Sequence, residues 1–152
     1  MEDLDQKMGY LAGLDGFEKV DLISDFEENY DFTFVFFKDF DEKYLFEFLG
    51  KMRANDLAID HKAGITPTNI NWTLRYLLDE NDQEHKTMLV VNEINSYLKK
   101  ASQKKEETGE ENLEIKNLVR DLNLYFKTSG ENFDINVAHD FRDKIKDLVE
   151  NL

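Results

Sequence analysis

Apolar residues along this chain recur mostly at helical spacing, and one short run suits a strand instead. Residues 32–37 read Phe-Thr-Phe-Val-Phe-Phe, an aromatic and β-branched run that is typical of a buried strand. Asp41 is a suitable N-cap for a helix directly after this strand. The inner face of that helix is an apolar stripe at intervals of three and four residues: Leu45, Phe48, Leu49 and Met52.

The middle of the chain gives mixed signals. Residues 53–65 fit no single element, although a short helix around 56–62 is compatible with the pattern before Gly64. Thr66 followed by Pro67 predicts a helix start, because the cap precedes the only proline at the first helical position. Residues 86–91, Lys-Thr-Met-Leu-Val-Val, suit either a strand or the beginning of the next helix.

The C-terminal third predicts two amphipathic helices that follow a solvated linker. Residues 99–111 are a run of charges with Gly109 inside it, which predicts a solvated helix end followed by that linker. The first helix has apolar positions at Ile115, Leu118, Val119, Leu122, Tyr125 and Phe126. The second has them at Val137, Ala138, Phe141, Ile145, Leu148, Val149 and Leu152. We expect an antiparallel pair that packs on the main body or on a second subunit.

These elements predict a mainly α (α+β) fold with a small β element around 32–37 and a C-terminal helical pair. We expect residues 1–100 to form an acidic, phenylalanine-rich α+β domain and residues 112–152 to form a helical hairpin. That hairpin packs on the first domain or dimerises. The chain has 152 residues, 41% of them hydrophobic and 12% aromatic, which is enough to form a packed core.

Negative charge is concentrated in the first part of the chain. Residues 1–60 hold 16 acidic and six basic residues, whereas residues 61–152 hold 17 and 13. The first 31 residues contain ten carboxylates and only two basic side chains, Lys7 and Lys19. Such a surface repels nucleic acid and lipid headgroups and attracts basic protein surfaces.

These carboxylates have two interpretations. One is a solvated face that maintains solubility. The other is a docking face for a basic partner, with Phe40 or Tyr30 as aromatic anchors beside it. The predicted partner-binding residues are Asp15, Glu18, Asp21, Asp25, Glu27, Glu28 and Asp31. The docking pattern is similar to that of acidic inhibitors from bacteriophages and mobile elements, which imitate duplex phosphates and occupy basic nucleic-acid channels.

Chemistry that would indicate an enzyme is missing from the sequence. There is no cysteine, and the three histidines, His61, His85 and His139, lie in unrelated segments without metal-ligand spacing. Phosphate-binding and nucleophile-elbow motifs are also missing. We therefore expect no catalytic residue, metal or cofactor. The acidic N-terminus does not look like a secretory signal, and we expect a cytoplasmic protein without a membrane partner.

Gly64-Ile65-Thr66 with Ile70 matches the turn of a helix-turn-helix, and residues 85–91 match a wing strand. With these motifs, residues 57–98 resemble a winged-helix segment of the MarR and Sar type. The resemblance implies a regulator that binds DNA as a dimer, with Asn69, Asn71 and Arg75 available for DNA contacts. Ala58 lies two residues too far from Gly64 for the usual spacing, and the segment before Lys86 is short for a wing.

The leading functional hypothesis is a non-enzymatic inhibitor or regulator that docks on a basic protein which handles nucleic acid. A winged-helix regulator that binds DNA as a homodimer is the second hypothesis. An immunity or antitoxin protein that neutralises a basic toxin is the third, and it shares the mechanism of the first.

Overall fold

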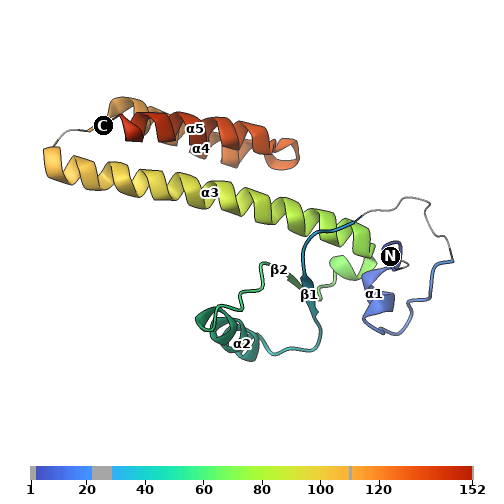
Figure 1. The fold of residues 1–152 in the computed structure, drawn as a ribbon. Helices are drawn as coiled ribbons and strands as arrows, with labels where there is room; N and C mark the ends of the chain where they lie inside the picture. The colour runs from blue at the N-terminus through green and yellow to red at the C-terminus, as the bar shows by residue number, and fades with distance from the viewer. Residues whose placement is uncertain (1–2, 22–28, 110, 152) are drawn as a thin grey trace. The chain divides into compact units, whose positions relative to one another are not determined.

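The computed structural model describes residues 3–21, 29–109 and 111–151 (Figure 1). The described chain is mainly helical and contains one two-stranded parallel sheet, so the predicted mainly α (α+β) fold is confirmed. The elements are α1 (Met8–Leu11), β1 (Phe34–Phe37), α2 (Glu42–Ala54), β2 (His61–Gly64), η1 (Asn69–Asn71), α3 (Leu74–Thr108), α4 (Leu113–Thr128), η2 (Gly130–Asn132) and α5 (Ile135–Glu150). None of the described helices is both long and apolar enough to cross a membrane.

The chain forms two compact units, Met1–His85 and Lys86–Leu152. The first unit contains the sheet, α1, α2 and the first turns of α3. The second contains the rest of α3, α4 and α5. The division into 1–100 and 112–152 stays a prediction.

The sheet of the first unit is formed by two strands that α2 connects. Phe34 pairs with His61 and Phe37 with Gly64 in a parallel register, so the strand predicted within residues 32–37 is confirmed. The short helix considered at 56–62 is wrong, because β2 forms at its end. His-Lys-Ala-Gly carries little intrinsic strand preference, and its strand conformation depends on pairing with β1.

The predicted helix start at Thr66-Pro67 is wrong, although Thr66 does cap a turn. Thr66 Oγ1 accepts a hydrogen bond from the Asn69 N–H at 3.1 Å, and Asn69 Oδ1 accepts one from the Thr66 N–H at 2.9 Å. These two hydrogen bonds close a turn that leads directly into the 3₁₀ helix η1. The α-helix begins only at Leu74, where Thr73 Oγ1 accepts from the Tyr76 N–H at 3.2 Å.

Residues 86–91, which suit either a strand or a helix in sequence, lie within α3. The whole segment is helical, so the strand alternative and the wing strand expected at 85–91 are wrong. The reason is that Val90 and Ile94, one turn apart, are both buried in the core of the second unit. The same helix continues to Thr108 and α4 begins at Leu113, so the solvated helix end and the linker predicted within residues 99–111 are confirmed.

The second unit contains the predicted C-terminal helical pair, α4 and α5. Both helices begin at a capping side chain, Asn112 for α4 and Asp134 for α5, which accepts hydrogen bonds from the first turn. The core of the unit is built from five buried residues: Val90, Ile94, Leu122, Ala138 and Ile145. Leu122 of α4 and Ala138 and Ile145 of α5 are among the apolar positions whose 3.6-residue period predicted these two helices.

One glycine in the first unit is required by packing. A Cβ added to Gly9 would lie 2.5 Å from the ring of Phe17. Gly9→Ala is therefore expected to destabilise the protein by about 1–2 kcal/mol, because the ring must move from the backbone. The measurement is urea unfolding followed by the fluorescence of Trp72, the only tryptophan.

Gly50→Ala in α2 is the matched control for this substitution. Nothing lies within 4 Å of a Cβ added there, and alanine favours a helix interior over glycine. In dilute protein we expect Gly50→Ala to raise stability slightly. Equal effects of the two alanine substitutions would contradict the packing argument.

Candidate protein-interaction surface

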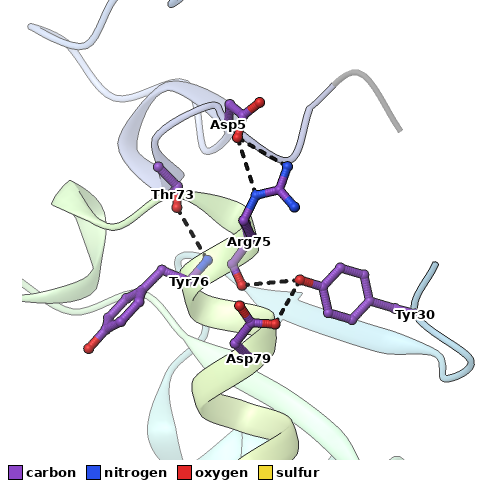
Figure 2. A network of polar contacts seen from close by, with 6 residues as sticks. All are labelled: Asp5, Tyr30, Thr73, Arg75, Tyr76 and Asp79. Atoms are coloured by element: carbon purple, nitrogen blue, oxygen red, sulfur yellow. Dashed lines mark hydrogen bonds and ion pairs between the residues drawn. The ribbon is translucent and has the colours of Figure 1, made fainter. Parts of the chain in front are cut away.

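Within the acidic N-terminal segment (residues 1–32), residues 4–6 are attached to the first turn of α3. The Leu74 and Arg75 N–H groups donate to the carbonyl oxygens of Gln6 and Leu4 at 2.9 and 2.8 Å. The Arg75 guanidinium contacts Asp5 Oδ1 through Nε at 3.3 Å and Nη2 at 3.2 Å (Figure 2). Strand-like backbone pairing and an ion pair thus hold residues 4–6 in place.

Gln6 attaches a second part of the segment. Its side chain is only 2% exposed, and its Oε1 accepts from the Val20 N–H at 2.8 Å while its Nε2 donates to the Val20 oxygen at 2.7 Å. One side chain therefore satisfies both backbone groups of Val20. The ring of Phe17 packs over Gly9 nearby in sequence. Residues 15–20 are consequently held at Phe17 and at Val20, although they form no helix.

Tyr30 and Phe32 attach the far end of the acidic segment. The Tyr30 hydroxyl donates to Asp79 Oδ1 at 2.8 Å, and Figure 2 shows this contact one turn beyond Arg75 on α3. Phe32 stacks on His61, with ring centroids 3.9 Å apart. Tyr30 is half-buried by these contacts. Tyr30 therefore holds this end of the segment against α3. Phe40, the other predicted anchor, is 51% exposed.

The predicted partner-binding residues fall into two groups. Asp15, Glu18, Asp21 and Asp31 are exposed, and none has an ion pair with a described residue. The other three lie outside the described residues: Asp25, Glu27 and Glu28. The structure thus presents four carboxylates on an anchored segment, without a neutralising partner in the described part of the chain.

Carboxylates of the second unit have a different environment. Glu111 accepts hydrogen bonds from Lys105 and Lys116 at 2.8 and 2.9 Å, and these contacts lower its pKa to about 2. The hydrogen bond from Arg142 likewise lowers the pKa of Asp143. Glu111 and Asp143 are thus paired within the unit, so their charge is less available to a partner.

Net charge also differs between the two units. Residues 1–85 contain 20 acidic and eight basic side chains, a balance of −12, whereas residues 86–152 contain 13 and 11, a balance of −2. Within the first unit, residues 1–32 alone contribute ten acidic and two basic residues. In the same unit, the nearby charge of Glu80 raises the pKa of Tyr76.

Two histidines that lie far apart in sequence meet in the first unit. The rings of His61 and His85 are 4.4 Å apart, and His61 Nε2 lies 3.5 Å from Asp82 Oδ1. That distance exceeds a good hydrogen bond, and the buried Nε2 has no hydrogen-bond partner among the described residues. Among the described residues no group of three or more His, Cys, Asp or Glu side chains has metal-binding geometry. No periodic spacing in the sequence predicts this pair, because β2 supplies one histidine and α3 the other.

An exposed aromatic surface at α2 was predicted only in part, because Phe40 was considered as an anchor and Phe46 was not. Phe37 of the first unit is buried. However, Phe40, Phe46 and Phe48 are 51%, 65% and 38% exposed, and α2 has no buried residue. The two short strands are too small to cover a helix that is apolar over so wide an arc.

One protein-family model, described as a domain of unknown function (DUF3783), matches residues 33–88. The matched region contains β1, α2, β2, η1 and the first turns of α3. The most acidic part of the chain, residues 1–32, lies outside it. Comparison with curated proteins gave no match, and comparison with solved structures gave none either.

Proposed function

We propose that this protein is a non-enzymatic inhibitor or regulator that docks on a basic, nucleic-acid-handling protein through its N-terminal acidic segment. The observation that carries the proposal is the set of four exposed carboxylates, Asp15, Glu18, Asp21 and Asp31, which have no ion pair among the described residues. A basic partner would neutralise them.

Attachment of the segment supports this proposal. Gln6 hydrogen-bonds to the backbone of Val20, and Tyr30 donates to Asp79, so the four described carboxylates lie on or next to backbone that is held before binding. A preordered charged surface loses less conformational entropy on association than a disordered acidic tail. Complementary charge also raises the rate at which the two proteins meet.

The proposal predicts a large effect of charge reversal. Replacing Asp15, Glu18, Asp21 and Asp31 by lysine is expected to abolish capture of the partner from a cell lysate, while the far-UV circular dichroism stays that of the parent protein. The captured partner should be a protein that survives nuclease treatment and is released by high salt, because screening weakens exposed charge contacts.

A control with the same change in net charge separates a specific surface from overall acidity. Glu106, Glu107, Asp140 and Asp147 are exposed side chains of the second unit, and lysine at these four positions changes the net charge equally. We expect this variant to retain the partner. Equal loss in both variants would show that only total charge matters. Recovery of DNA that disappears after nuclease would instead support the winged-helix regulator.

A further inference from the structure

Helix α2 has a second exposed side besides the apolar stripe that faces the sheet. Glu42, Phe46, Gly50 and Arg53 follow at intervals of four, four and three residues, so they share one side of the helix. All four are exposed, and Phe46 is 65% exposed. Figure 1 shows that loops join α2 to β1 on one side and to β2 on the other.

Each member of this stripe lacks a partner in the described part of the chain. Neither Glu42 nor Arg53 forms an ion pair with a described residue. A Cβ added to Gly50 would meet nothing within 4 Å. A large apolar ring and an unfilled space therefore lie one helical turn apart on the same exposed side.

The order of the stripe is self-complementary. It reads acid, aromatic, glycine, base from the N-terminal to the C-terminal end of α2. If a second α2 is laid antiparallel with the twofold axis near residue 48, Phe46 lies opposite Gly50 of the other copy. Glu42 then lies opposite Arg53 of that copy. With a rise of 1.5 Å per residue, the members of each pair lie within about 2 Å of each other along the axis.

We propose that α2 is a self-association surface on which α2 of a second copy packs antiparallel. In this contact the Phe46 ring fills the space over Gly50 of the other copy, and two Glu42–Arg53 ion pairs close its ends. The contact is isologous, as twofold dimers require. This inference does not rest on the proposed docking function, because it uses a different part of the first unit.

Charge favours a second copy as the occupant. Residues 38–56 contain five acidic and four basic side chains, so this region lacks the strong negative excess of residues 1–32. Within the stripe, Phe46 is 65% exposed and provides roughly 130 Å² of apolar surface per copy, given about 200 Å² for a large side chain. This area is below that of a specific, stable interface, so we expect a weak dimer that forms only at high concentration.

Sedimentation velocity of the full chain from low micromolar to several hundred micromolar concentration tests the proposal. The parent protein is expected to shift from monomer to dimer over this range, and Phe46→Asp is expected to stay monomeric. Glu42→Arg and Arg53→Glu each place like charges opposite one another. Each should raise the dissociation constant about tenfold, since two pairs are disrupted per interface.

The double variant Glu42→Arg with Arg53→Glu gives the decisive result, because it restores opposite charges across the twofold axis. We expect its dissociation constant to return close to that of the parent. Both changes oppose the helix dipole, so the double variant has the less stable α2 and helix stability cannot explain the recovery. Leu124→Asp, at a 60% exposed position of α4, is the control that should leave the dimer unchanged.

Three outcomes would overturn the proposal. One is a protein that remains monomeric at every concentration. Another is a dimer that Leu124→Asp dissociates and Phe46→Asp does not, which would place the interface on the C-terminal helices. The last is a double variant that is as weak as the single variants, because that result excludes the antiparallel pairing.

Discussion

Replacing Gln6 by glutamate is expected to destabilise the first unit by about 3–5 kcal/mol at neutral pH, because a buried hydrogen-bond donor is replaced by a buried charge. The side chain is 2% exposed, and its Nε2 donates to the Val20 oxygen at 2.7 Å. An ionised carboxyl at this position would face that oxygen without a proton to share. The measurement is urea unfolding followed by Trp72 fluorescence.

The same substitution has a predicted pH dependence. The introduced carboxyl is buried beside a carbonyl oxygen, so its pKa in the folded state is raised above the unfolded value of about 4.3. Since the protonated form can donate to the Val20 oxygen, the deficit relative to the parent protein should be smallest below that unfolded value. It should grow as the pH rises through the folded pKa.

Gln6→Ala separates the hydrogen bonds from the charge. It removes both bonds to Val20 without introducing a carboxylate, and we expect a loss of about 2–4 kcal/mol that does not follow the pH profile of the glutamate variant. If the proposed docking function is correct, both variants should also weaken partner capture, because residues 15–20 lose their attachment. Unchanged stability in Gln6→Ala would show that the Gln6–Val20 contact does not hold the segment.

The parts of the fold that sequence predicts are those whose signal is local. Residues 32–37 are aromatic and β-branched, and β1 forms there. The C-terminal helices have regular apolar spacing and capping residues before each, and α4 and α5 form as expected. In these segments the pattern of single residues and the tertiary packing favour the same structure.

The parts that could not be predicted depend on contacts between distant residues. His61–Gly64 becomes a strand only because β1 lies beside it. The side chain of Gln6 bonds to the backbone of Val20 fourteen residues away, and no spacing rule reports such a contact. For the candidate surface, sequence predicted the acidic positions but not their attachment. It also treated α2 by its inner stripe alone, so the exposed side with Phe46 and Gly50 was missed.

The largest effect in the second unit is expected from Ile145→Ala. Ile145 is fully buried, and it belongs to the core with Val90, Ile94, Leu122 and Ala138. Truncation removes the transfer free energy of the lost methyl and methylene groups and leaves a cavity, because α3, α4 and α5 all contribute to the surrounding wall. We expect the free energy of unfolding to fall by about 2–5 kcal/mol. The measurement is urea unfolding followed by circular dichroism at a helical wavelength.

Leu124→Ala is the matched control, because leucine at 124 is 60% exposed and the substitution opens no cavity. Its effect should stay within about 0.5 kcal/mol. A comparable loss in the two variants would mean that burial in this core does not determine stability. Ile145→Ala should also leave partner capture by the folded protein intact, since none of the acidic surface lies in the second unit. Loss of capture without unfolding would instead require α5 to take part in docking, which would contradict an interaction confined to the acidic N-terminal segment.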